Sequence, residues 1–266
     1  GKTIVCTVHN VVGHETNIVD RICSQIIYWL SNKLIVHSEL NKHQLLNQFR
    51  VSKEKITAMP RGIYQFYFQG RFSRESARLE LGLKKDDTIF LFFGHIRDYK
   101  GLDILLHAFF GLAKKRSEVT LLIVGQPWIN WDVYKEMIDG SGVGERIVTV
   151  LGYIPTSDVE KYFRAADVLV LPYRKFGSQS GPGNIGLAAG IPMVVTRTGA
   201  LPDLTNREEA VVEPGNVDEL CEILTRLVDD HELICLLRKD AVERSVENSW
   251  EQTAKATVSL YNSVLD

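Results

Sequence analysis

The stretch that decides the fold is TIFLFFGHIRDYKGLDILLHAFFGLAKK, residues 88–115. It opens with an apolar run that stops at Gly94, which is typical of a strand buried on both faces of a sheet. It closes with apolar residues at positions i, i+3 and i+4, which is typical of an amphipathic helix. Between the two lie three side chains that can carry positive charge, His95, Arg97 and Lys100. The stretch therefore predicts a strand–loop–helix unit whose connecting loop is basic.

The same alternation of apolar runs and helical patterns extends over most of the chain. Continuous apolar runs separated by helices predict parallel strands that are covered on both faces. We therefore expect an α/β fold with a doubly wound, Rossmann-like sheet. The expected strands are residues 2–9, 33–38, 55–60, 88–94, 119–125, 146–152, 167–172, 192–198 and 210–215.

The domain boundaries are predicted from the place where this rhythm lapses, the aromatic and basic residues 61–87. We expect a partial N-terminal α/β domain at 1–66, a complete Rossmann-like domain at 67–245, and a C-terminal helix at 246–266 that packs back on the N-terminal domain. Two or three strands are too few to cover their own apolar faces. We therefore expect the chain to be the later part of a longer protein, or to lack its first residues.

The composition narrows the function classes. The 266 residues carry a formal net charge of −2, so a general affinity for nucleic acid is not expected. No apolar run reaches the roughly 18 residues of a membrane helix. The four cysteines lie far apart in apolar contexts, which favours buried, reduced thiols. We expect a cytoplasmic protein without a nucleic-acid partner. The cysteines are Cys6, Cys23, Cys221 and Cys235.

The basic loop falls where ligands bind to an open parallel sheet, beyond the carboxyl end of a strand and at a helix N-terminus. Arg97 offers a fork of donors and Lys100 a point charge, so a diphosphate is the ligand that this loop favours. A solvated turn whose cations face water is the alternative interpretation of a single basic loop.

A second loop, KFGSQSGPGNIGLAAGIP at residues 175–192, follows an apolar run and leads into a helix of small residues. Its backbone N–H groups could approach a ligand closely, although a surface loop fits the pattern equally well. Gly181, Gly183 and Gly186 spell G-x-G-x-x-G. A dinucleotide site needs this motif tight against the first strand and an acidic residue at the end of the next strand. Neither condition holds, so a nicotinamide cofactor is not expected.

Taken in order, these pieces resemble the C-terminal half of a family-four glycosyltransferase of the GT-B fold. The resemblance covers about residues 75–245. It rests on FFGHIRDYKGLDILLHAF, LLIVG, VLGYIPTSDVEKYFRAADVLVLPY, AAGIPMVVTRTGALPDL and VVEPGNVDELCEIL. TVHN, KLIVHSE and KITAMPRG are similar to the end of the family's acceptor domain, whose usual first half is absent from the chain. The resemblance implies a C-terminal domain that binds a nucleotide-diphosphate sugar.

The resemblance also implies roles for single residues. Lys100 falls on the lysine of the family's K-G pair, and Arg97 matches members with an I-R-x-Y-K-G form, so both are expected to hold the diphosphate. His9, in TVHN, falls on a histidine near the reacting sugar and completes the expected catalytic set. His14, in GHE, is expected on the acceptor side. The implied donor-binding residues are Gly94, His95, Tyr153, Ile154, Ser178, Gln179, Ser180 and Gly181.

The chain departs from the family pattern at two positions. The family usually carries two glutamates separated by seven residues, and the corresponding residues here are Gly177 and Ile185. The second glutamate normally holds the ribose hydroxyls, so this chain must hold a ribose by other groups. A hydroxyl or an amide can replace hydrogen bonds there, but it cannot replace a charge.

The expected function is that of a retaining glycosyltransferase of polysaccharide biosynthesis. It would move a hexose from a UDP- or GDP-linked donor to a hydroxyl of a saccharide or lipid-linked saccharide, without a metal or another cofactor. The missing glutamates favour one alternative, a non-catalytic subunit that binds nucleotide sugars. A nucleotide-sugar epimerase is a third interpretation. Peripheral association with the inner face of the membrane, through the missing N-terminal part, stays open.

Overall fold

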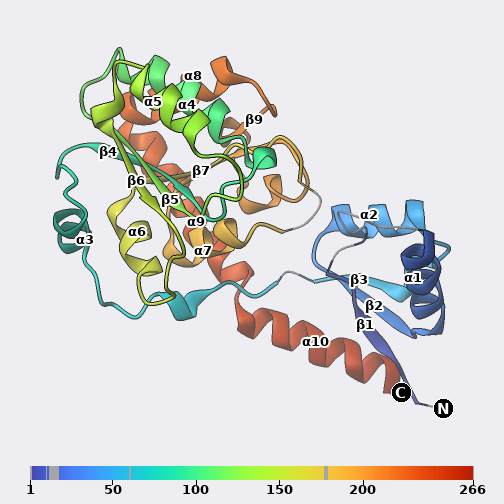
Figure 1. The fold of residues 1–266 in the computed structure, drawn as a ribbon. Helices are drawn as coiled ribbons and strands as arrows, with labels where there is room; N and C mark the ends of the chain where they lie inside the picture. The colour runs from blue at the N-terminus through green and yellow to red at the C-terminus, as the bar shows by residue number, and fades with distance from the viewer. Residues whose placement is uncertain (1, 10, 12–17, 60, 177–178, 266) are drawn as a thin grey trace. The chain divides into compact units, whose positions relative to one another are not determined.

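The computed structural model describes residues 2–9, 11, 18–59, 61–176 and 179–265. Contacts among these residues form two compact units. Unit 1 consists of the described residues within 1–63, residue 179 and the described residues within 246–266, and unit 2 consists of residues 64–176 and 180–245. Figure 1 shows both units in one ribbon view.

Unit 2 is built on a six-stranded sheet whose strands are all parallel. Each strand falls within one of the expected apolar runs, so the predicted doubly wound α/β fold is confirmed. The strand order is β6-β5-β4-β7-β8-β9. The strands are β4 (Thr88–Phe93), β5 (Val119–Gly125), β6 (Ile147–Leu151), β7 (Val168–Leu171), β8 (Met193–Thr196) and β9 (Val211–Val212).

Helices cover both faces of this sheet (Figure 1). The helices α4, α5 and α8 form one layer, while α3, α6 and α7 form the other. The central strand β4 shows why the fold needs two layers: Phe90 and Leu91 point to opposite faces and neither exposes any surface. The helices are α3 (Arg74–Glu80), α4 (Leu102–Ala113), α5 (Asp132–Asp139), α6 (Val159–Ala165), α7 (Gly181–Ala189), α8 (Val217–Asp229) and α9 (His231–Glu247).

The strand order places a switch point between β4 and β7. From β4 the chain moves outward through β5 and β6, and it then returns to the other side of β4 with β7 and continues to β8 and β9. In sheets of this kind the loops after the two central strands diverge and leave a crevice beyond their carboxyl ends. A ligand site is therefore expected among the residues of the loops that follow β4 and β7.

A buried ion-pair network ties α3 to the amino end of β7. The carboxylate of Asp167 accepts bonds from Arg78 Nη2 at 2.6 Å, from Arg74 Nη2 at 2.8 Å and from the backbone N–H of Ile89 at 2.8 Å. The Arg78 side chain is 3% exposed, so this carboxylate neutralises a guanidinium that water cannot reach. Removing one member of such a network leaves the other charge buried without compensation.

Unit 1 contains the parallel strands β1 (Val5–Thr7), β2 (Lys33–Val36) and β3 (Ile56–Ala58) in that order. Side chains alternate across β2: Leu34 and Val36 pack with α1 (Ile18–Leu30) and α2 (Glu39–Gln48), whereas Ile35 packs with Met59 and Leu260. Leu260 belongs to α10 (Trp250–Leu265), so α10 covers the second face of this sheet. The helix α1 exposes Ile18, Val19, Ile22, Ile26, Ile27, Trp29 and Leu30.

All four cysteines are free thiols, in agreement with the expected reduced state. Their expected burial is wrong for Cys23 and Cys235, which are exposed, because each lies on the outer side of a helix rather than in a strand. Cys6 and Cys221 are half-buried.

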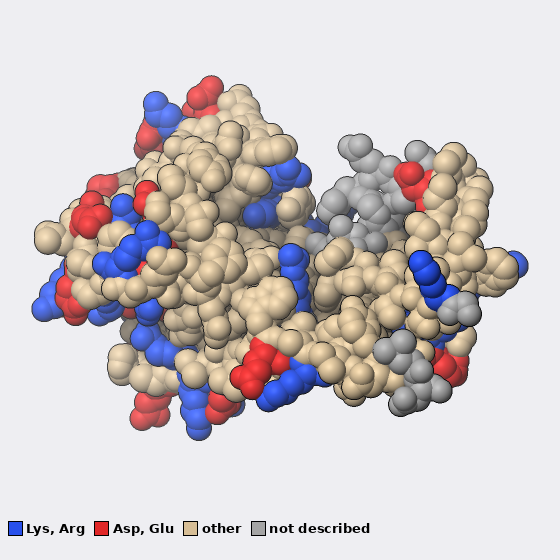
Figure 2. All heavy atoms as spheres, turned by 90° about the horizontal axis from the view of Figure 1, so that it is seen from below, with Lys and Arg blue, Asp and Glu red and all other residues tan. Residues whose placement is uncertain are grey.

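Charge is mixed over the surface. Lysine and arginine side chains alternate with aspartate and glutamate on much of the face shown in Figure 2, in keeping with the net charge of −2. Within the part of the chain that the structure describes, no helix combines the length and the apolarity that crossing a membrane requires.

Candidate functional site

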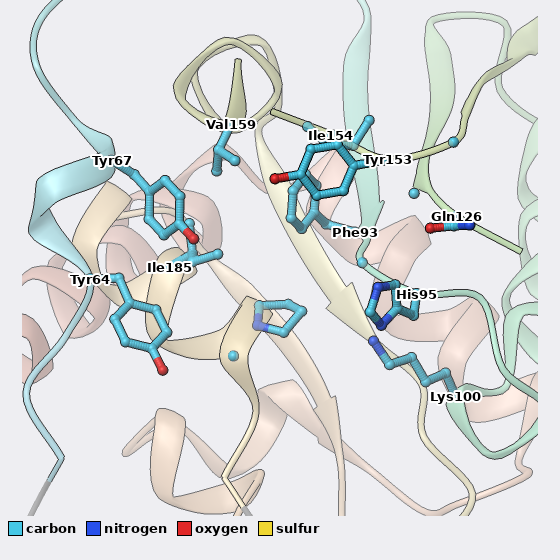
Figure 3. Close-up of a pocket in the computed structure, with 15 residues that line it drawn as sticks. Tyr64, Tyr67, Phe93, His95, Lys100, Gln126, Tyr153, Ile154, Val159 and Ile185 are labelled. Atoms are coloured by element: carbon cyan, nitrogen blue, oxygen red, sulfur yellow. The ribbon is translucent and has the colours of Figure 1, made fainter. Parts of the chain in front are cut away.

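A cavity of about 290 Å³ lies in unit 2 beyond the carboxyl ends of β4, β5 and β6, beside the N-terminus of α7 (Figure 3). Its position is that of the crevice which the strand order predicts. The lining residues are Tyr64, Tyr67, Phe93, Gly94, His95, Lys100, Gly125, Gln126, Gly152, Tyr153, Ile154, Val159, Gly181, Pro182 and Ile185.

Two glycines let the ends of β4 and β5 approach each other on the floor of this cavity. Gly125 has a φ of +143°, and a Cβ atom added there would lie 2.0 Å from the carbonyl oxygen of Gly94. No other residue fits that position, because the backbone angle is strained for a side chain and the space is already filled. The close approach brings the backbone of both strand ends to the cavity.

Lys100 is the buried cation of the site. It ends a 3₁₀ turn (Asp98–Lys100), lines the cavity and is only 6% exposed. Burial, followed by the nearby charge of Arg97, lowers its pKa from 10.5 to about 8. No ion pair of Lys100 with a carboxylate occurs among the described residues, and its closest recorded partner is the ring of Tyr173, with Nζ 5.4 Å from the centroid. A buried ammonium without an acidic partner is poised to receive an anion.

The other two cations of the basic loop behave differently. Arg97 does not line the cavity: its guanidinium lies over the ring of Trp128, with Cζ 4.1 Å from the centroid. His95 lines the cavity and also contacts the Trp128 ring. Burial, with the charges of Lys100 and Arg97, lowers the pKa of His95 below its usual value, so its ring is neutral at pH 7. The positive charge inside the cavity therefore comes from Lys100.

The N-terminus of α7 forms the wall beside Lys100. Ser180 caps this helix: its hydroxyl accepts a bond from the N–H of Gly183 at 3.2 Å and lies 3.3 Å from the hydroxyl of Tyr173. Gly181 and Pro182 begin the helix and line the cavity. The first N–H groups of a helix attract anions when they lack partners. Pro182 has no N–H, and the N–H groups of Gly183 and Asn184 bond to Ser180, so the N–H of Gly181 is the one in this turn that can serve an anion.

The G-x-G-x-x-G run lies inside α7 rather than in a turn after a strand. A Cβ at Gly183 would lie 2.4 Å from Leu204, and one at Gly186 would lie 2.8 Å from Leu169. Gly183 and Gly186 therefore serve close packing of the helix, a role that the sequence pattern did not predict.

The wall opposite His95 and Lys100 is aromatic (Figure 3). Tyr64 precedes and Tyr67 ends a 3₁₀ turn (Gln65–Tyr67) that packs against α7, and Tyr153 follows β6. The aromatic composition of this segment is visible in the sequence, but no motif there assigns it to a ligand. Only the contact between the turn and α7 brings Tyr64 and Tyr67 to the cavity.

A buried glutamate fixes the chain just after this turn. The carboxylate of Glu160, which exposes no surface, accepts bonds from the backbone N–H groups of Gln69 at 3.1 Å, Gly70 at 3.0 Å and Arg71 at 3.2 Å. Burial raises the pKa of this carboxyl, but the three N–H groups and Arg164 outweigh burial and lower the pKa overall. Glu160 thus stays ionised and holds residues 69–71 in place.

In unit 1, His9 forms a pair with His37. His37 Nε2 lies 3.2 Å from His9 Nδ1, and His37 Nδ1 lies 3.4 Å from the carbonyl oxygen of Met59. The Met59 oxygen can only accept, so it requires the proton on His37 Nδ1, and His37 Nε2 then accepts from His9 Nδ1–H. Burial lowers the pKa of His37, which supports the neutral form. His9 Nδ1–H is thus engaged by His37, and Nε2 is the ring nitrogen of His9 that this pair does not use.

The remaining expected residues are accounted for as follows. Gly94, Tyr153, Ile154 and Gly181 line the cavity. The amide Nε2 of Gln179 donates to the carbonyl oxygen of His37 at 2.6 Å, and both residues belong to unit 1. His14 and Ser178 lie outside the described residues, as does Gly177, whereas Ile185 lines the cavity. The described residues contain no cluster of three His, Cys, Asp or Glu side chains that could hold a metal ion.

The model for the family described as "Glycosyl transferases group 1" matches residues 87–230 of the chain. The D-inositol 3-phosphate glycosyltransferase of Corynebacterium glutamicum (strain R) is 27% identical over 256 residues, which are 92% of this chain and 60% of that protein. The MMP alpha-(1->4)-mannosyltransferase of Mycolicibacterium hassiacum is 28% identical over 239 residues, which are 88% of this chain and 54% of that protein.

Among solved structures, Alr3699/HepE of Anabaena in complex with UDP and glucose is similar over 98% of this chain and 72% of that one, with a TM-score of 0.81 and 15% identity. This likeness confirms the expected GT-B-like fold class. The chain spans less than two thirds of the length of the curated relatives it matches, 60% and 54% in the two examples given.

Proposed function

Since this chain belongs to the glycosyl transferases group 1 family, we propose that it transfers a hexose from a nucleoside-diphosphate sugar to a hydroxyl of a saccharide or lipid-linked saccharide, with retention of configuration. One observation carries the proposal. Lys100 is buried without an acidic partner, among the described residues, in a cavity whose neighbouring wall is a helix N-terminus. The Lys100 ammonium and the N-terminus of α7 both attract negative charge, and a diphosphate supplies it.

The proposed reaction needs little from the protein beyond positioning and electrostatics. The acceptor oxygen bonds to the anomeric carbon while the bond from that carbon to the diphosphate oxygen breaks. The acceptor's proton passes to the departing diphosphate on the same face, so atoms and charge balance. Lys100 and the backbone N–H of Gly181, at the start of α7, stabilise the charge that develops on the leaving group.

The donor of first choice is a UDP-linked sugar. HepE of Anabaena was solved with UDP and glucose, and two relatives are named as transferases of sugars. The cavity supports a nucleotide of this kind because aromatic side chains face the Lys100 end from the opposite wall. His9, whose Nδ1 is engaged by His37, is the proposed contact for a sugar hydroxyl through Nε2.

The test is a thermal-shift series with UDP, GDP, ADP and their sugars. A ligand present at about 100 times its dissociation constant adds about 2.7 kcal/mol to the free energy of unfolding. We expect one nucleoside diphosphate to raise the melting temperature of the protein and to leave that of Lys100→Ala unchanged. If none of the diphosphates shifts the melting curve, the proposed function is wrong.

A second candidate is a subunit that binds the nucleotide sugar without turnover. The apolar side chain of Ile185 in the cavity wall, where the family carries a carboxylate, favours this candidate. The two are separated by release of the nucleoside diphosphate from its sugar. A transferase releases it faster when an acceptor saccharide is added, whereas a binding subunit releases none.

A further inference from the structure

The cavity has charged and uncharged ends, and no described residue that lines it is acidic. Lys100 and the start of α7 form the charged end. A nucleotide is covalently ordered as phosphate, ribose and base, so a diphosphate at Lys100 directs the ribose toward the side walls of the cavity. The vicinal hydroxyls of a ribose need hydrogen-bond partners once they leave water.

The wall formed by α7 offers no side-chain partner at its middle. Ile185 lines the cavity there, is 6% exposed and has no polar atom in its side chain. Tyr67 lines the same cavity, and the turn that carries Tyr67 packs against α7. The hydroxyl of Tyr67 is thus a polar side-chain group of the cavity on an element that contacts this wall (Figure 3).

Tyr67 is held in place for such a contact. Its ring lies 4.4 Å from that of Phe66 and 6.2 Å, edge to face, from that of Tyr64. The three hydrogen bonds that Glu160 accepts from residues 69–71 fix the chain two residues further on. A positioned phenol loses little conformational freedom when it binds a ligand.

The Tyr67 hydroxyl has the hydrogen-bonding capacity that a diol requires. Burial raises its pKa, with the neighbouring Tyr64 and Tyr153 acting in the same direction, so it keeps its proton at neutral pH. A protonated phenol both donates and accepts. Over the described residues, no hydrogen bond of this hydroxyl to another side chain or to the backbone is recorded.

We propose that Tyr67 is the residue that recognises the ribose hydroxyls of the nucleotide, in place of an acidic residue on α7. The proposal rests on the proposed function, since it assumes that a nucleoside diphosphate occupies this cavity. It makes Tyr67 a specificity-determining residue that distinguishes ribose from deoxyribose. A neutral hydrogen bond predicts a modest preference, about fivefold.

The experiment is calorimetric titration of the protein with UDP and with 2′-deoxy-UDP, or with the corresponding pair of whichever base binds. We expect the protein to prefer the ribonucleotide about fivefold and Tyr67→Phe to bind both equally. Tyr67→Phe keeps the ring and its packing, so it is expected to fold. The matched control is Tyr134→Phe, which removes a hydroxyl from a tyrosine of unit 2 that does not line the cavity and is expected to keep the preference.

A rescue variant sharpens the test. In the double variant Tyr67→Phe with Ile185→Glu, the new carboxylate takes over the diol, and we expect the preference for ribose to return. The inference is wrong if the protein binds UDP and its 2′-deoxy form equally, or if Tyr67→Phe leaves the preference intact. Absence of binding by every nucleoside diphosphate is a different result, because it contradicts the proposed function itself.

Discussion

The guanidinium of Arg97 lies 4.1 Å from the centre of the Trp128 ring, beside the cavity rather than inside it. It is nevertheless close enough to lower the pKa of Lys100, so the two cations feel each other's charge. Trp128 is 57% exposed, and its ring also contacts His95. The Trp128 ring thus keeps a second cation at the rim of the site, next to a lysine whose charge would otherwise repel it.

We expect Arg97→Ala to weaken UDP binding more than uridine binding, by on the order of 1–2 kcal/mol, because it removes a positive charge at the rim of the site that attracts the diphosphate. Trp128→Ala should reduce the binding free energy of UDP by less, about 0.5–1 kcal/mol, because it removes only the cation–π contact that positions Arg97. Trp128→Phe keeps an aromatic ring under the guanidinium, so it should retain most of the affinity of the original protein. Arg116→Ala, at a surface pair with Asp229, is the control. Equal losses for UDP and uridine would show that the charge of Arg97 does not act on the diphosphate.

Lys100→Met should stabilise the free protein while abolishing diphosphate binding. Burial lowers the pKa of Lys100 from 10.5 to about 8, and that difference corresponds to about 3 kcal/mol of unfavourable burial at neutral pH. Chemical denaturation without ligand should therefore give a free energy of unfolding that is higher for Lys100→Met, by on the order of 1–3 kcal/mol. A destabilised variant would contradict the view that Lys100 is retained for function rather than for folding.

The affinity for UDP should fall as the pH rises through about 8, the pKa of Lys100 in the free protein. Only the protonated lysine attracts the diphosphate, so binding loses up to about tenfold per pH unit above that value until the pKa of the complex is reached. Titrations at about pH 7 and pH 9 measure the effect on either side of that pKa.

The Lys100→Met variant is the control, because the loss of affinity on raising the pH should disappear in it. The stability difference between the two proteins should also shrink as the pH rises from about 8 toward 10.5. The reason is that the folded-state pKa is the lower one, so the unfolded chain binds more protons in this window and stability rises with pH. An affinity for UDP that does not change over the two titrations would exclude Lys100 as the diphosphate ligand.

Gly125→Ala should destabilise unit 2 much more than Gly152→Ala. Both glycines line the cavity with positive φ, +143° and +126°. Only at Gly125 would the new Cβ meet an atom, the Gly94 carbonyl oxygen at 2.0 Å, while nothing lies within 4 Å of the other. We expect about 1 kcal/mol for the shared backbone strain and several kcal/mol more for the clash. Similar melting temperatures for the two variants would contradict the close approach of the two strand ends.

Asp167→Asn should reduce the free energy of unfolding by about 3 kcal/mol or more, because it leaves the guanidinium of Arg78 buried without a counter-charge. Asp229→Asn is the matched control: its partner Arg116 lies at the surface, so the change should cost less than about 1 kcal/mol. Denaturant titration of both variants measures the difference. Equal effects would mean that burial does not decide the value of these pairs.

Much of the fold follows from the sequence because the buried strands are almost purely apolar. TIFLFF and VTLLIV each predict a strand covered on both faces, and each is one. The expectation for the cysteines failed where helices were concerned, since an apolar context does not say which side of a helix a residue occupies. Cys23 and Cys235 lie on the exposed side.

The charged end of the site was also predictable, because Lys100 belongs to a motif that lies between a strand and a helix. The aromatic end was not. Tyr64 and Tyr67 reach the cavity through the packing of a short 3₁₀ turn on α7, which begins far along the chain at Gly181. No periodicity records such a contact. The stacking of Arg97 on Trp128 likewise depends on two loops whose mutual approach only the folded sheet defines.

The bonding of Glu160 to three successive amide groups bears on how a nucleotide gets in. The buried, ionised carboxylate of Glu160 holds residues 69–71 in place. The neighbouring turn is therefore expected to keep its position, and the Tyr67 phenol with it, when a ligand binds. Tyr153, which also lines the cavity, is 77% exposed. Association of a nucleotide should therefore be limited by diffusion rather than by the opening of a gate. Its rate constant should fall in proportion as the viscosity of the solvent rises.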